Sequence, residues 1–167
     1  VETGYAVKKF MSNFGDNNVE CRTDNQFVHE SLNSFRFNTP INKIEEADLI
    51  LLIGANPKIE TPIINHKIFK AFNNGSEIFN IGEDILLNYD TKYLGKQLEA
   101  LNNEKFVKSI KKSKNPLIIA GSAFLNSIRN IDTFKSIVSF SQKYKVITET
   151  KNNLNFLNPF SSRVGQL

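Results

Sequence analysis

Short apolar runs without alternation mark the strands of this chain. The clearest is Leu49 to Ile53, an unbroken aliphatic run, which is typical of a strand that other elements cover on both faces. Gly54 ends the run and Pro57 fixes φ shortly after it, so the chain can reverse at once into a helix. Burial of these five side chains stabilises the fold by about 1.5–3 kcal/mol each, or on the order of 10 kcal/mol together. We therefore expect a central strand here.

Other segments resemble this strand, and glycine again follows the apolar run. Residues 77–81 precede Gly82, and residues 117–120 precede Gly121. Strands are predicted at residues 19–21, 49–53, 77–81, 117–120 and 145–149, with a turn at residues 93–95.

Apolar residues at helical spacing predict helices between these strands. Thr39 is expected to cap one helix with Pro40 at its first position, and residues 73–75 are a typical helix stop. Helices are predicted at residues 2–14, from residue 40 for one or two turns, and at 59–72, 98–101, 106–112 and 131–144. Residues 23–37 are expected to form a loop packed by aromatic side chains.

This alternation of strands and helices predicts an α/β fold. Long crossovers between parallel strands run right-handed and leave helices on both faces of the sheet. We expect a doubly wound, mostly parallel sheet of about five strands within residues 1–150. Residues 151–167 have no sustained period and are expected to form an irregular C-terminal extension.

Composition narrows the class of protein. The chain has 167 residues, 40% of them hydrophobic and 23% charged, so we expect one domain with a core of its own. No apolar run approaches the roughly 20 residues of a membrane helix. The net charge of +4 is scattered along the chain, and there is no basic stripe of the kind that binds nucleic acid. The chain begins at Val1, so we expect a processed product or part of something longer.

Residues capable of metal or thiol chemistry are few. Cys21 is the single cysteine, which excludes a disulfide framework and any all-cysteine zinc or iron–sulfur site made by this chain alone. It is expected to be an inert buried thiol in a reducing compartment. His29 and His66 have no further ligands at suitable spacing, so both are expected to be surface or hydrogen-bonded histidines.

An acidic group precedes the central strand. Glu45, Glu46 and Asp48 resemble a general-acid cluster, but open parallel sheets react at the carboxyl ends of their strands, and these acids lie at the other end. We therefore expect a solvated linker of acids.

Glycines at positions 54, 82 and 121 are expected along the carboxyl edge of the sheet, where this architecture binds ligands. No Gly-x-Gly-x-x-Gly motif, Walker motif, nucleophile elbow or Ser-His-Asp order occurs, so turn chemistry explains these glycines. We predict no catalytic, cofactor-binding or metal-ligating residue on this chain.

A set of motifs nevertheless resembles one family, the large iron–sulfur subunit of respiratory complex I (NADH:ubiquinone oxidoreductase), within its C-terminal, molybdopterin-oxidoreductase-like domain. The resemblance spans almost the whole chain in order. It is carried by Asn38-Thr39-Pro40-Ile41, Ile44-Glu45-Glu46-Ala47-Asp48, Leu51-Leu52-Ile53-Gly54-Ala55-Asn56-Pro57-Lys58, Glu60-x-Pro62-Ile63-x-Asn65-x-Lys67-Ile68-x-Lys70, Tyr93-Leu94-Gly95, Pro116-Leu117-Ile118-Ile119-Ala120-Gly121-Ser122 and Ser161-Ser162-Arg163-Val164-Gly165.

This chain departs from the family at two points. Leu32 and Asn33 stand where the family leads us to expect an arginine. The family's N-terminal half, with the cysteines that hold iron–sulfur clusters, is absent. The resemblance therefore implies a split or partial large subunit with no cofactor of its own, the clusters being on a partner or on a missing N-terminal part.

The resemblance also implies a role and a location. We expect a structural part of the hydrophilic arm of complex I, in contact with other hydrophilic-arm subunits, above all the cluster-bearing part of the large subunit. It is expected on the matrix side of the mitochondrial inner membrane or on the cytoplasmic face of a bacterial membrane. Phenylalanines at positions 27, 35, 37, 156 and 160 are candidates for docking, and packing in the chain's own core explains them as well.

Two alternatives remain open. The Ala47-Asp48-x-x-Leu51-x-x-Gly54 strand also resembles the middle domain of thiamine-diphosphate enzymes, which would imply a nucleotide-binding α/β domain. A fragment of a true molybdopterin oxidoreductase is the other alternative.

Overall fold

A central sheet of five parallel strands organises the computed structural model, which describes residues 2–16, 36–127 and 131–158. The order across the sheet is β3-β2-β1-β4-β5, and all four pairings are parallel. The strands are β1 (Leu49–Ile53), β2 (Glu77–Ile81), β3 (Lys92–Gly95), β4 (Pro116–Ala120) and β5 (Leu154–Phe156). This confirms the predicted parallel α/β class and the central position of residues 49–53.

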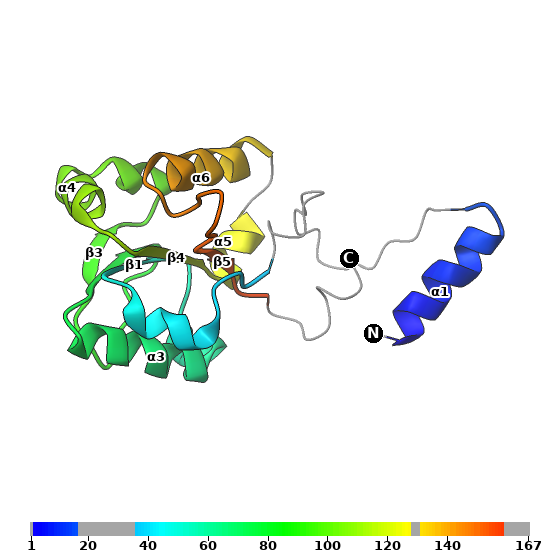
Figure 1. The fold of residues 1–167 in the computed structure, drawn as a ribbon, viewed down its shortest axis with the longest axis horizontal. Coiled ribbons are helices and arrows are strands. Elements are labelled where there is room, and N and C mark those ends of the chain that lie inside the picture. The colour runs from blue at the N-terminus through cyan, green and yellow to red at the C-terminus, as the bar shows by residue number, and fades with distance from the viewer. Residues whose placement is uncertain (1, 17–35, 128–130, 159–167) are drawn as a thin grey trace.

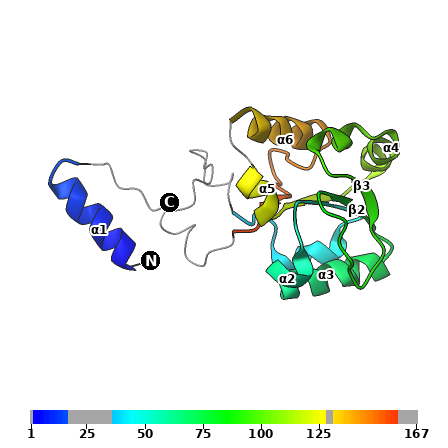
Figure 2. The same ribbon diagram turned by 180° about the vertical axis from the view of Figure 1, so that it is seen from behind.

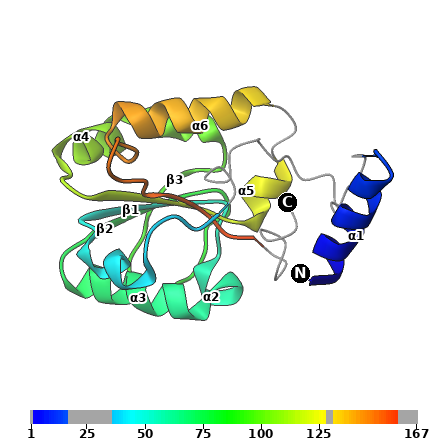
Figure 3. The ribbon, with the colours of Figure 1, turned by 45° about the vertical axis from the view of Figure 1, so that its right-hand side comes forward.

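Helices cover both faces of this sheet (Figure 1). On one face lie α3 (Pro62–Asn73), with α2 (Pro57–Glu60) before it, and the 3₁₀ helix η2 (Ile41–Glu46). On the other face lie α4 (Glu104–Lys112), the 3₁₀ helix η3 (Leu98–Asn102) and α6 (Ile131–Lys143), as Figure 2 shows from behind. The short helix α5 (Ser122–Ser127) lies at the end of β4 (Figure 3), and α1 (Glu2–Asn13) has no buried residue.

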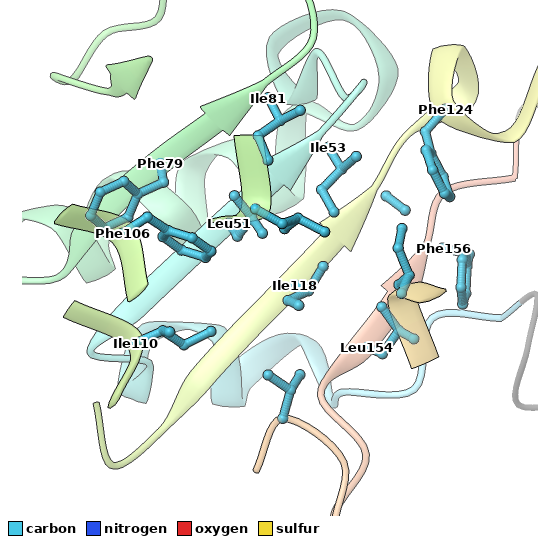
Figure 4. Packing of buried hydrophobic residues seen from close by; sticks show 14 of the residues in the cluster. Leu51, Ile53, Phe79, Ile81, Phe106, Ile110, Ile118, Phe124, Leu154 and Phe156 are labelled. Carbon is cyan, nitrogen blue, oxygen red and sulfur yellow. The ribbon is translucent and has the colours of Figure 1, made fainter. Parts of the chain in front are cut away.

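The two-sided cover explains the unbroken apolar run in β1. Leu51 and its neighbours at 49 and 53 pack with Phe79 and with Phe106 of α4 on one face of the sheet, and Figure 4 shows Leu51, Ile53, Phe79 and Phe106 in this cluster. Ile50 and the residue at position 52 pack with Ile68 of α3 on the opposite face. Successive strand residues point to opposite faces, so a strand between two helical layers needs apolar side chains at every position.

Two strand assignments from the sequence are wrong. Residues 93–95, expected as a turn, belong to the edge strand β3. The last strand is β5, within the stretch 151–167 that was expected to be irregular, and not residues 145–149. Lys145 has φ of 59°, which interrupts an extended chain after α6, and Ile147 makes only an isolated antiparallel bridge with Asn152.

Tertiary hydrogen bonds explain why β5 forms despite its polar middle residue. The Asn155 side chain is fully buried. Its Oδ1 accepts the backbone amides of Asn38 at 2.8 Å and Thr39 at 2.7 Å, and its Nδ2 donates to Thr39 Oγ1 at 3.0 Å. A buried amide group is tolerated when its donors and acceptors are satisfied in this way.

Two helix starts also differ from expectation. Thr39 does not cap a helix, because its hydroxyl is engaged by Asn155 and donates to Asn153 Oδ1 at 3.3 Å. The 3₁₀ helix η2 begins after Pro40. The helix expected over residues 59–72 is divided at Thr61, which has φ of −150° before Pro62, because a residue that precedes proline is disfavoured in helical conformation.

The other predicted helices, at residues 2–14, 98–101, 106–112 and 131–144, are confirmed within about two residues at their ends. The strand expected at 19–21, most of the aromatic loop at 23–37 and the closing motif at 161–165 lie outside the described residues. Within the described residues, no helix is both long enough and apolar enough to cross a membrane.

Candidate functional site at the carboxyl edge of the sheet

The strand order defines a crevice between β1 and β4. From β1 the chain moves outward through β2 and β3, then returns to the other side of β1 to form β4 and β5. In open α/β sheets, ligands bind outside the carboxyl ends of the strands where the direction of winding changes in this way. The loops that follow β1 and β4, at residues 54–57 and 121–122, therefore make the candidate site.

The predicted row of glycines lies at this edge. Ile53 pairs with both Ile81 and Ala120 across the sheet, so the residue after each of these strands, a glycine in all three cases, falls at the same level. The space beside two of these glycines is already filled. A Cβ on Gly54 would lie 2.6 Å from the backbone nitrogen of Phe124. Close packing between loops accounts for Gly54 and Gly121, and the positive φ of Gly54 and Gly82 is a turn conformation that favours glycine.

A carboxylate joins the two loops of the crevice. Glu60, the last residue of α2, accepts the amide of Asn56 at Oε1 (2.6 Å) and the amide of Ser122 at Oε2 (2.9 Å). Asn56 follows β1, and Ser122 begins α5 after β4. Glu60 is half-buried. Each oxygen of one carboxylate thus binds one of the two loops that border the switch point.

The sequence did not single out Glu60. A glutamate that caps its own helix stands three residues after the N-cap, whereas Glu60 stands four residues after Asn56. The second amide is 62 residues further along the chain, and no local pattern reveals it. The sequence offered two signals, the place of Glu60 shortly after the Gly54–Pro57 turn and its place at the start of the family motif Glu60-x-Pro62-Ile63.

A cleft of about 710 Å³ adjoins the crevice. Its apolar lining includes Ile53 and Ile81 at the ends of β1 and β2, with Leu98 and Phe124. The charged side chains around it are Glu83, Lys96, Glu99 and Asp132. Lys96 pairs with Glu83 at 3.6 Å, so the exposed carboxylates of Glu99 and Asp132 give the cleft a net negative charge, which disfavours anions.

Comparison with known proteins gives the family. A family model described as "Molybdopterin oxidoreductase" matches residues 1–167. The chain belongs to the molybdopterin oxidoreductase family. Its curated relatives include the NADH-ubiquinone oxidoreductase 75 kDa subunit of Reclinomonas americana, 33% identical over 81% of this chain and 20% of the relative. An NADH-quinone oxidoreductase polypeptide of the bacterium Rickettsia bellii is 31% identical over 99% of this chain and 25% of the relative.

A third relative is the mitochondrial NADH dehydrogenase [ubiquinone] iron-sulfur protein 1 of Solanum tuberosum, 28% identical over 93% of this chain and 22% of the relative. The chain therefore spans about a fifth to a quarter of the length of these relatives. Within the molybdopterin oxidoreductase family, its relatives are large subunits of complex I from mitochondria and bacteria, which confirms the resemblance seen in the motifs.

The name of the family implies a molybdopterin, and the residues at this edge do not fit one. A phosphate-bearing pterin needs free hydrogen-bond donors for its anionic oxygens. The amides of Asn56 and Ser122 are already taken by Glu60. In the described ranges, no group of three His, Cys, Asp or Glu side chains could hold a metal ion.

The acids that precede β1 lie at the opposite, amino edge of this family domain, as expected, and they have structural partners. Asp48 accepts the Ser113 hydroxyl and the amides of Lys114 (2.7 Å) and Asn115 (3.0 Å). Burial raises the pKa of the Asp48 carboxyl, but these hydrogen bonds outweigh it and the pKa is lowered. Asp48 therefore holds the loop before β4 against β1.

The two glutamates of this group make ion pairs. The hydrogen bond from Lys67 Nζ, at 2.5 Å, lowers the pKa of the Glu45 carboxyl. Glu46 pairs at 2.7 Å with Lys43 on the surface. All three acids thus have partners, and the expected solvation holds for the exposed Glu46 and Asp48, whereas Glu45 is half-buried.

The remaining candidates fall into two groups. His66 is exposed on α3. Phe156 is buried in the α4–α6 core, the apolar cluster between the sheet and helices α4 and α6. Phe37 packs against the apolar cluster on the α3 face of the sheet. Packing inside the domain therefore explains these two phenylalanines, which the sequence had offered as candidates for docking. Cys21, His29 and the phenylalanines at 27, 35 and 160 lie outside the described residues.

Proposed function

We propose that this chain is a structural domain of the large subunit of respiratory complex I, split or partial, with no redox centre of its own. The observation that carries the proposal is the agreement of the whole chain with complex I large subunits of mitochondria and bacteria. The single cysteine in the sequence supports the second half of the proposal, because one thiolate cannot hold a four-cysteine cluster.

The domain can act as a rigid brace because it has a complete core. Both faces of the sheet are covered, and every residue of β1 and β4 is buried. Such a unit keeps its shape while its outer surface packs on neighbours. The proposed neighbours are the cluster-bearing part of the large subunit and other hydrophilic-arm subunits, on the matrix side of the mitochondrial inner membrane or the equivalent bacterial face.

Helix α1 offers a surface for such packing. Val7 and Phe10 lie at helical spacing on α1, Phe14 follows directly after the helix ends at Asn13, and all three side chains are exposed. The rings of Phe10 and Phe14 contact each other with centroids 4.8 Å apart. Aromatic side chains anchor the cores of protein interfaces, so α1 supports the proposed contact with the cluster-bearing part.

Isolation of the native assembly tests this function. We expect the chain to co-purify with NADH dehydrogenase activity, and lysine-specific cross-links from Lys8 and Lys9 of α1 to reach a cluster-bearing polypeptide in mass spectrometry. A native complex that contains this chain and no NADH dehydrogenase subunit would disprove the proposal.

A second measurement tests the absence of a redox centre. The purified 167-residue chain should contain no stoichiometric iron or molybdenum by elemental analysis and show no iron–sulfur absorption. It should also fail to oxidise NADH. Stoichiometric metal in the isolated chain would overturn this part of the proposal, while co-purification with complex I would remain a separate result.

A further inference from the structure

The crevice between β1 and β4 contains a ligand supplied by the chain itself. We infer that the Glu60 carboxylate occupies the position where this architecture receives an anionic group, so that a phosphate-bearing nucleotide or pterin is excluded from the switch point. The inference deepens the proposed structural role and rests on it, because it names the residue that closes the crevice.

The geometry around Glu60 is that of a bound anion. Its two oxygens lie 2.6 and 2.9 Å from the amide nitrogens of Asn56 and Ser122. Neither amide has a partner within its own helix, since Asn56 is the N-cap of α2 and Ser122 is the first residue of α5. Bonds from amides to a carboxylate are charge-assisted and stronger than bonds between neutral groups. The carboxylate thus satisfies two donors that would otherwise be free for a ligand.

The same side chain also fixes the shape of the crevice. The backbone amide of Glu60 donates to the carbonyl of Asn56 at 2.9 Å, so the loop after β1 closes on itself through both the backbone and the side chain of Glu60. The bond to Ser122 then ties this loop to the start of α5. Figure 3 shows α2 and α5 at the same end of the sheet.

Steric and electrostatic features beside Glu60 also oppose the entry of a phosphate group into the crevice. The backbone of Phe124 in α5 fills the space next to Gly54. In the adjoining cleft, Glu83, Glu99 and Asp132 outnumber Lys96. An incoming phosphate would have to displace the Glu60 carboxylate from both amides while it approached the exposed carboxylates of the cleft, whose repulsion is strongest at low ionic strength.

Amide NMR on the 167-residue chain tests the inference, with sodium pyrophosphate and ADP as the anionic probes. In the wild-type protein, we expect the Asn56 and Ser122 signals to stay in place when either probe is added to millimolar concentration. In Glu60→Gln, both signals should move upfield, because one of the two amides keeps only a neutral oxygen acceptor and the other faces the NH2 group, which cannot accept its hydrogen bond. Glu99→Gln is the matched control, since it removes an exposed carboxylate from the adjoining cleft and should leave both signals unchanged.

Two results would overturn the inference. One is a shift of the Asn56 and Ser122 signals when pyrophosphate or ADP is added to the wild-type protein, which would instead support the nucleotide-binding alternative. The other is a Glu60→Gln spectrum in which these two signals do not move. The wild-type titration requires no variant, so the test stands even if Glu60→Gln does not fold. It is also independent of whether the chain co-purifies with complex I.

Discussion

Gly121 lies in direct contact with Ala55 across the switch point, where a Cβ on Gly121 would come within 2.3 Å of the Ala55 Cα. The two residues belong to the loops that follow β4 and β1. Their contact brings the two loops close enough for the Glu60 carboxylate to reach an amide in each.

Substitution Gly121→Ala should therefore destabilise the domain severely. The added methyl group meets backbone atoms, which cannot move aside as a flexible side chain would, and overpacking of this kind costs about 3 kcal/mol or more. Urea unfolding followed by circular dichroism measures the change in the free energy of unfolding.

Gly75→Ala is the control for that experiment. Gly75 has φ of 95° and open space around its Cβ position, so the variant has only the backbone strain of a left-handed residue, about 1–2 kcal/mol. A loss in Gly121→Ala no larger than the loss in Gly75→Ala would show that the loops can separate to admit a methyl group.

Asp48 should make stability depend on pH in acid. Its pKa is lowered from the ordinary value of 3.8, so its contribution to stability is fully present above that value and is lost as the pH falls through the lowered pKa. Asp48→Asn removes the charge, and we expect a loss of about 1 kcal/mol at neutral pH, because charge-assisted hydrogen bonds at an exposed position contribute modestly.

The gap in stability between Asp48→Asn and wild type should narrow below about pH 4, as measured by urea unfolding at a series of pH values. Asp84→Asn removes an exposed carboxylate from the loop after β2 and serves as the charge-matched control. A gap of the same size and pH dependence in both variants would assign the effect to net charge, and the hydrogen bonds of Asp48 would have no role.

The buried side chain of Asn155 should be essential for β5. Asn155→Ala removes the acceptor of two backbone amides, at residues 38 and 39, and several further hydrogen bonds inside the fold. Loss of a partner by buried polar groups costs about 1–3 kcal/mol for each group, so we expect a total of about 3 kcal/mol in chemical denaturation. The exposed Asn88 provides the control, and equal losses in Asn88→Ala and Asn155→Ala would refute the argument.

Phe106 should be among the costliest positions of the α4–α6 core. Its ring meets Phe79 edge-on at 5.0 Å and stacks on Phe140 at 6.0 Å, and the side chain is fully buried. Phe106→Ala should lower the free energy of unfolding by about 3–5 kcal/mol. Phe10→Ala on α1, where 60% of the side chain is exposed, should change it by less than about 0.5 kcal/mol. A cost in Phe10→Ala as large as that in Phe106→Ala would mean that α1 forms part of the same core.

The central part of the fold could be predicted from local sequence. Strands β1 and β4 carry unbroken apolar runs, and β2 carries three apolar residues interrupted by Asn80. Such a run is stable only where both faces are covered. The edge strands β3 and β5 could not be predicted in this way. Strand β3 holds polar and glycine residues because its position is at the rim, and β5 depends on hydrogen bonds to residues 116 or more positions away.

The candidate site likewise has a part that the local sequence predicts and a part that depends on contacts between distant segments. The glycines at the strand ends and their alignment along one edge follow from the strand pattern and from parallel topology. Glu60 was not identified, because its role requires the loop after β4 to lie beside the loop after β1, and that neighbourhood exists only once the sheet has formed.

The sequence alone thus determined the family, the parallel α/β class and the alignment of three glycines along one edge of the sheet, since hydrophobic runs and motif order are local properties of the chain. The tertiary structure decided where the last strand lies and what fills the crevice. Both depend on hydrogen bonds between residues far apart in the chain, Asn155 with Thr39 and Glu60 with Ser122, and such pairings arise from topology.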